Sequence, residues 1–150
     1  MSRIVLAILF ASAILTGCGA LTTTPPAPTP ADFPGIASEL VRRGIGVERI
    51  VSGDPGCDDV ELARTAIGID ANGLDQATPT RVHFYIFRNR ETFERLRQTV
   101  DACARDFVTD PEAFESVESS PFVVAGPGPW APEFKAALRA AIEEVAGTGG

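Results

Sequence analysis

The chain has 150 residues, a formal net charge of −7, 45% hydrophobic residues and 22% charged residues. These values are typical of one small globular domain and exclude a wholly disordered chain. Acids outnumber basic residues by 20 to 13, which argues against a nucleic-acid partner. With three cysteines and a single histidine, His83, the sequence also argues against a disulfide-framework miniprotein and predicts no metal site and no cofactor.

The first seventeen residues have the order of a secretory signal. Arg3 supplies a positive charge, and residues 4–15 are apolar except for Ser12. A membrane-spanning helix needs about 20 apolar residues, so this run is too short to span. The chain then reads Leu15-Thr16-Gly17-Cys18, which resembles the lipobox of bacterial lipoproteins. An ordinary secretory signal followed by a chance cysteine is the alternative.

The resemblance implies how the protein is processed and where it resides. The Cys18 thiol would be alkylated by a diacylglyceryl group, the chain would be cut before Cys18, and the new α-amino group is a further acylation site, with palmitate expected. Two or three acyl chains, at about 0.8 kcal/mol per buried methylene, hold a protein to a membrane effectively permanently. The implied location is the extracytoplasmic side of the bacterial cell membrane or outer membrane. In a Gram-negative bacterium, Gly19 after the lipid cysteine would indicate the outer membrane.

A Thr/Pro-rich segment follows the predicted anchor. Eight of the nine residues 22–30 are Thr or Pro, which favours an extended spacer at ~3.1 Å per residue. A proline-rich ligand for an SH3-like partner is the alternative, but no Arg or Lys flanks the prolines. The predicted organisation is a leader over 1–17, a lipidated cysteine and stalk over 18–31, one domain over 32–147 and a disordered tail over 148–150.

The domain is predicted to begin with a helix that Asp32 caps and Gly44 ends. Three strands follow, over about 47–52, 62–70 and 81–88. In the third strand, hydrophobic and aromatic residues occupy both alternating sets, so we expect both of its faces to be at least partly covered.

A long helix is predicted to begin at the Asn89 cap, because apolar residues then recur at intervals of three and four until Asp110-Pro111. Two short extended runs, about 114–118 and 121–126, precede a last helix that starts at Pro132. The order is α-β-β-β-α-β-β-α. It indicates an α+β fold, with a mainly antiparallel sheet of four to five strands and helices packed on one face.

Cys57 and Cys103 are predicted to form a disulfide. An exported chain enters an oxidising compartment, and with Cys18 lipidated these are the two remaining thiols. A redox-active pair is the alternative, but neither a C-x-x-C spacing nor basic neighbours are present to lower a thiol pKa.

Two groups of acids have spacings that suggest calcium ligands. One is Asp54, Asp58, Asp59 and Glu61, and the other is the run Asp70-x-Asn72-Gly73-x-Asp75. The EF-hand pattern requires a Glu at position twelve, where this chain has Arg81. Acids are common in turns for backbone reasons, so we interpret both groups as turn acids.

His83 and Trp130 are the remaining candidate site residues. His83 has the one side chain suited to proton transfer near neutral pH, but a buried or half-exposed sheet histidine is the favoured interpretation. Trp130 follows Gly126-Pro127-Gly128-Pro129 and is a candidate binding surface. The favoured alternative is that its ring fastens this loop to the core.

Two classes of function fit the sequence. The favoured one is a non-enzymatic envelope lipoprotein whose domain binds a protein, a glycan or a small ligand, or has a structural role. The other is a membrane-tethered exported hydrolase or metal-dependent enzyme that uses His83 and nearby acids. A deep pocket that holds His83 beside two or more acids would favour the enzyme, and a flat apolar patch around Trp130 would favour binding.

Overall fold

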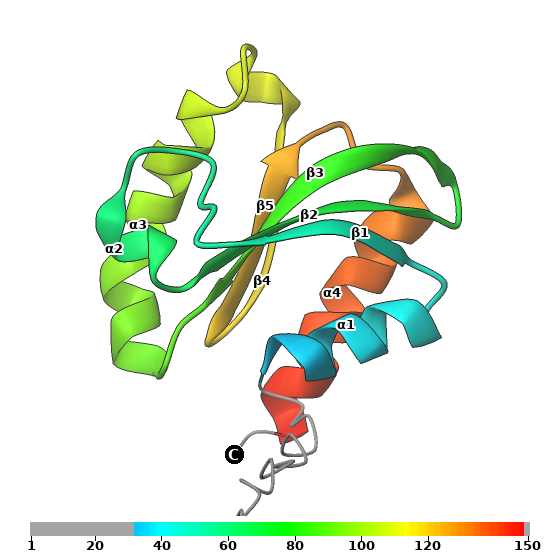
Figure 1. Cartoon of the computed structure of the whole chain (residues 1–150), viewed down its shortest axis with the longest axis horizontal. Coiled ribbons are helices and arrows are strands. Elements are labelled where there is room, and N and C mark those ends of the chain that lie inside the picture. Colours follow the sequence, from blue (N-terminus) through cyan, green and yellow to red (C-terminus); the bar gives the residue numbers. More distant parts are fainter. Residues whose placement is uncertain (1–31, 149–150) are drawn as a thin grey trace, which may run out of the picture.

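The computed structural model describes residues 32–148 (Figure 1). The predicted leader, lipid cysteine and stalk lie outside the described residues, as do residues 149 and 150. In chain order the elements are α1 (Phe33–Arg42), β1 (Gly46–Ser52), α2 (Val60–Ala63), β2 (Ala66–Gly73), β3 (Gln76–Ile86), α3 (Arg90–Asp106), the 3-10 turn η1 (Pro111–Ala113), β4 (Phe114–Ser119), β5 (Phe122–Pro127) and α4 (Pro132–Thr148).

The five strands form one sheet in the order β1-β2-β3-β5-β4, and all neighbouring strands are antiparallel. The predicted α+β class and antiparallel sheet are therefore confirmed. Two hairpins, β2–β3 and β4–β5, supply most of the sheet, and β5 inserts beside β3. In this register His83 lies opposite Gly68 on one side and Ala125 on the other.

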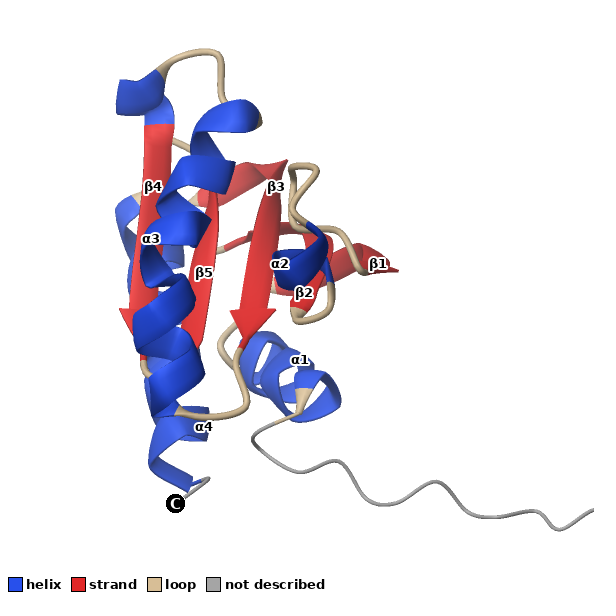
Figure 2. Ribbon diagram, turned by 90° about the vertical axis from the view of Figure 1, so that its left-hand side faces the viewer, coloured by secondary structure: helices blue, strands red, loops and turns tan. Residues whose placement is uncertain are grey.

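Helices cover both faces of the sheet, whereas the sequence predicted one helical layer (Figures 1 and 2). The first core, under α1 and α4, contains Val82 and Phe84 of β3. The second core, under α2 and α3, contains Tyr85 and Phe87 of the same strand. Because both faces of β3 are apolar, each needs its own cover, and the expectation that both faces of this strand are covered is met.

The predicted strand over 62–70 begins later than expected. Residues 60–63 form α2, and the Asp59 carboxylate accepts a hydrogen bond from the backbone N–H of Leu62 at 2.8 Å. The Leu62 side chain, which the sequence assigned to the strand, is fully buried in the second core. Conversely, β3 begins at Gln76 rather than near residue 81, because the β2–β3 hairpin closes tightly at Gly73.

The described residues contain both cores, the whole sheet and the disulfide, so this region has the contacts it needs to fold on its own. Within residues 32–148, no helix is both long enough and apolar enough to cross a membrane.

Candidate functional site

A cluster of charged side chains lies at one end of the sheet face that α3 covers. It comprises Arg49, Asp54, Asp70, Arg81 and His83, which we call the polar cluster. β2 and β3 place Asp70 and Arg81 directly opposite each other, and β3 places His83 two residues further along on the same face. The absence of a Cβ at Gly68 leaves room there, since a side chain would collide with the Arg81 guanidinium and the Asp54 carboxylate.

Two arginines share the buried Asp70 carboxylate. Arg81 Nη1 lies 3.1 Å from Asp70 Oδ1 and also donates to the Arg49 carbonyl at 3.0 Å, while the Arg49 guanidinium pairs with the other carboxylate oxygen. Asp70 is only 6% exposed, and burial opposes its ionisation. The hydrogen bonds from Arg49 and Arg81 outweigh burial, so the pKa of Asp70 lies below its usual value.

A β-bulge in β1 places Arg49 in this arrangement. The strand register shifts between Glu48 and Val51, and Arg49 has a φ of 43°, in the left-handed region. A non-glycine residue there carries backbone strain. The Arg49 side chain nevertheless remains 78% exposed, so its pairing with Asp70 forms the outer rim of the cluster.

Asp54 lies between Arg81 and His83. Its Oδ2 pairs with Arg81 Nη2, and its Oδ1 lies 3.5 Å from His83 Nε2 and accepts from the Gly56 N–H at 3.0 Å. Partial burial opposes ionisation, but the bonds from Arg81 and Gly56 keep the pKa of Asp54 below its usual value. Asp54 is therefore an anion whose charge is already matched by Arg81.

The His83 imidazole is buried beside Asp54. The residue is 3% exposed, and its ring lies 4.7 Å from that of Phe107, which follows α3. Burial lowers the pKa of His83 more than the Asp54 charge raises it, so the ring is neutral near pH 7. Among the described residues, His83 Nδ1 has no hydrogen-bond partner and no solvent contact. Within the described residues, the imidazole is therefore almost wholly shielded from direct contact with a molecule in solvent.

A shallow depression of about 370 Å³ lies beside the polar cluster, lined by Arg49, Val51, Asp70, Pro79 and Arg81. His83 does not line it. This depression, within residues 32–148, therefore does not bring His83 together with two or more acids in a deep pocket. The sequence did not identify Arg49 or Arg81 as members of the polar cluster. The one signal that could have paired Asp70 with Arg81 is that the two residues flank the same hairpin.

The predicted disulfide between Cys57 and Cys103 is confirmed, with a Cα–Cα distance of 5.4 Å. It fastens the 53–59 loop to α3. Next to it, the buried Tyr85 hydroxyl donates to the Pro55 carbonyl at 2.7 Å, and burial raises the pKa of Tyr85. The loop that carries Asp54 is thus held from two sides.

Most of the acids with calcium-like spacing have structural partners. Asp59 caps α2, and Asp54 belongs to the polar cluster. Asp75 lies at the β2–β3 turn, and its two oxygens accept the N–H groups of Glu133 and Phe134 at 2.9 Å each, which caps α4 and lowers the pKa of Asp75. Within residues 32–148, no group of three or more His, Cys, Asp or Glu side chains is placed to hold a metal ion.

Trp130 is not a surface residue. It is 5% exposed, its Nε1–H donates to the Pro127 carbonyl at 2.9 Å, and its ring meets Phe134 edge-on. The candidate role of Trp130 as a binding surface is therefore wrong. Its indole fastens the 126–130 loop to the start of α4, which was the favoured alternative.

The chain matches no protein-family model, and no curated protein or solved structure matches it. No residue role therefore comes to this chain from a relative.

Proposed function

We propose that this protein is a lipid-anchored, extracytoplasmic envelope lipoprotein whose domain is a non-enzymatic binding or structural module. The observation that carries the proposal is Leu15-Thr16-Gly17-Cys18 directly after a basic residue and a short apolar run. These residues lie outside the described part of the chain. The partner would be an envelope protein, a glycan or a small ligand.

The disulfide supports export. Bonds of this kind persist in oxidising compartments and are rare in the cytosol. Cys103, on α3, is 3% exposed and belongs to the second core, where the bond fixes the fold rather than presenting a reactive thiol.

The closed polar cluster supports a non-enzymatic role. Each charged side chain of the cluster has an oppositely charged partner within the domain. Arg81 pairs with both Asp54 and Asp70, and Asp70 also pairs with Arg49. The alternative is a tethered hydrolase or metal-dependent enzyme. The observation in its favour is the 3.5 Å distance between His83 Nε2 and Asp54 Oδ1. Such an enzyme would need the imidazole in contact with substrate, and burial opposes this.

The anchor is tested on the full chain by comparing the Cys18→Ser variant with the unmodified protein. Membrane fractionation should show the unmodified protein in the membrane pellet, and mass spectrometry should show a diacylglyceryl group on an N-terminal Cys18. The variant should retain its leader and carry no lipid. Thr16→Ser, which keeps a small residue, is the matched control and should still be lipidated. An intact leader or an unmodified Cys18 sulfur in the natural chain would overturn the proposal.

A further inference from the structure

The imidazole of His83 is buried by segments outside the sheet. On the sheet, the residues opposite His83 are Gly68 on β2 and Ala125 on β5. Neither of them has a side chain large enough to cover a ring. The histidine is nevertheless only 3% exposed, so the cover over its ring comes from another part of the chain.

That cover is the loop of residues 53–57, which we call the lid, together with Phe107. Asp54 Oδ1 lies 3.5 Å from His83 Nε2, and the Phe107 ring lies 4.7 Å from the imidazole. Gly56 approaches so closely that an added Cβ would lie 2.9 Å from His83 Cε1 and would also collide with Phe107. The lid therefore closes over the ring at its edge, and Phe107 covers one of its sides.

The lid is built as a segment that can move between two fixed elements. It joins β1 to α2 and contains neither helix nor strand. Gly53 and Gly56 have φ angles of 78° and 80°, in the left-handed region that glycine adopts without strain. They flank Asp54 and Pro55. Backbone rotation at these two glycines would lift the residues between them while β1 and α2 stay in place.

The non-covalent contacts that hold the lid closed include an ion pair and a hydrogen bond. Asp54 pairs with Arg81, but these side chains are 30% and 27% exposed, so water screens their attraction. The Tyr85 hydroxyl donates to the Pro55 carbonyl at 2.7 Å. A typical hydrogen bond of this kind adds only modestly to stability, because an open lid would exchange it for a bond to water.

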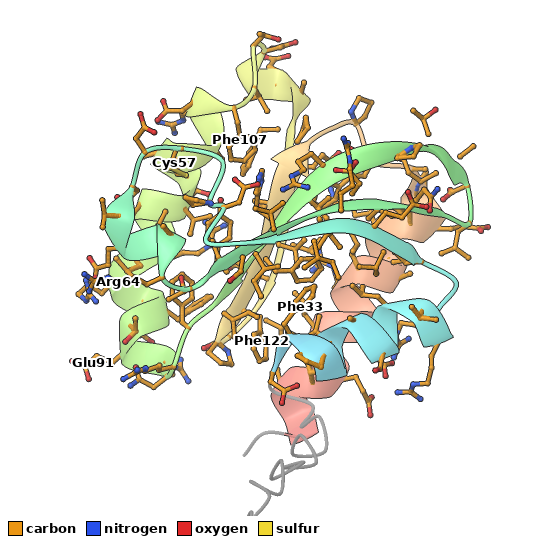
Figure 3. All side chains as sticks on the ribbon, viewed as in Figure 1. Phe33, Cys57, Arg64, Glu91, Phe107 and Phe122 are labelled. Atoms are coloured by element: carbon orange, nitrogen blue, oxygen red, sulfur yellow. A yellow bond between two sulfur atoms is a disulfide. The ribbon has the colours of Figure 1, made fainter. Side chains whose placement is uncertain are left out.

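The covalent contact is the disulfide, which ties the lid to α3. Cys57 is the last residue of the lid, and Cys103 lies on α3. Cys57 is only partly buried, and both cysteines line a surface depression of about 370 Å³. Figure 3 shows Cys57 beside Phe107, at the α3 side of the sheet. A small reductant can therefore reach the bond without first entering the core.

We propose that the lid is a redox-controlled cover, which the Cys57–Cys103 disulfide holds over His83 and which reduction of the bond releases. Release would uncover the imidazole and separate Asp54 from Arg81. The rest of the polar cluster would then hold two arginines and one acid, so the uncovered face would gain a net positive charge. The inference goes beyond the binding role proposed above and does not depend on the lipid anchor.

Opening the lid takes two electrons and two protons, which an external dithiol supplies. Its thiolate attacks Cys57 Sγ, the S–S bond breaks, and Cys103 leaves as a thiolate that takes up a proton. The second thiolate of the reductant then displaces the Cys57 sulfur, which is protonated in turn. The reductant becomes a disulfide and the protein holds two thiols. An external disulfide reverses the exchange and closes the lid.

The test measures the reactivity of His83, which is the single histidine of the chain. Residues 19–150 retain the self-contained domain and lack Cys18, so Cys57 and Cys103 are their only cysteines. The protein is reduced with dithiothreitol, the reductant is removed, and carbethoxylation by diethyl pyrocarbonate is followed by absorbance and located by mass spectrometry. The reduced protein should react at least about tenfold faster than the oxidised protein, because loss of the cross-link favours local opening. Reoxidation should restore the slow rate.

Two variants separate release of the lid from a general loss of stability. Cys57→Ser removes the bond without any reductant and should react as fast as the reduced protein. Leu138→Ala truncates a fully buried side chain in the first core, on the opposite face of the sheet, and lowers stability with the disulfide intact. It should keep the slow rate of the oxidised natural sequence. Urea unfolding gives the stability of each protein, and far-UV circular dichroism checks its fold.

Three results would overturn the inference. They are equal rates in the reduced and oxidised protein, a rate in Leu138→Ala as fast as in the reduced protein, or loss of the far-UV circular dichroism signal on reduction. The last would show that the bond holds the whole domain rather than the lid. Because residues 19–150 lack Cys18, each of these results leaves the proposed anchor standing. Conversely, an unlipidated Cys18 in the full chain would leave the difference in His83 reactivity standing.

Discussion

Loss of the Cys57–Cys103 disulfide should remove a large part of the stability of the domain. The bond closes a loop with a sequence separation of 46 residues. The chain-entropy model gives about 4 kcal/mol at 25 °C for a loop of that length, because the cross-link restricts the unfolded chain. A domain of this size has a free energy of unfolding of about 5–15 kcal/mol, so the loss would be a quarter or more of the total.

The two cysteines differ in burial, and this difference decides which variant to use. Cys103 is 3% exposed in the second core, so replacing it adds the free energy of a changed core contact to that of the lost cross-link. Cys57 is only partly buried, so Cys57→Ser removes the bond with less change in packing. Reducing the bond in the natural sequence leaves both side chains in place and is the matched control.

The assay is urea unfolding of residues 19–150 followed by far-UV circular dichroism. The Cys57→Ser variant and the reduced natural protein should agree and should both be about 4 kcal/mol less stable than the oxidised protein. The denaturant slope m should rise in both, because an unfolded chain without the cross-link exposes more surface. A loss below about 1 kcal/mol, with m unchanged, would refute the argument that this loop closure is a major source of stability.

Three other perturbations test the polar groups. Because the pKa of His83 in the folded state lies below its ordinary value of 6.5, the unfolded chain takes up the proton first as the pH falls. Stability should therefore decrease as the pH is lowered from about 7 to 5, and urea unfolding of His83→Gln should show a flatter profile in that window; equal profiles would contradict the assignment. Asp70→Asn removes the shared anion from two arginines and should destabilise the domain by about 2 kcal/mol in urea unfolding, while Asp106→Asn at an exposed position should change stability by less than about 0.5 kcal/mol. Asp75→Ala removes the cap of α4 and should lower the urea midpoint in the same assay; an unchanged midpoint would show that water replaces the carboxylate.

Local signals in the sequence predicted those elements whose causes lie within a few residues. Asn89 caps α3 through the Thr92 N–H, and Pro132 begins α4, both as the sequence indicates. The pairing of Cys57 with Cys103 followed from the expected oxidising compartment and from the two thiols that remain once Cys18 is lipidated. Neither argument needs knowledge of the fold. These predictions succeeded because capping and thiol counting do not depend on how distant elements pack.

Features that depend on distant contacts were not predicted. The partners in the polar cluster are 11 residues apart for Asp70 and Arg81, and 27 apart for Asp54 and Arg81, so the register of the sheet brings them together. The bulge at Arg49 leaves no clear mark in the sequence, since a charged residue in an edge strand has no special composition. Which helix covers which face likewise depends on contacts between elements far apart in the sequence, such as those that build the two cores.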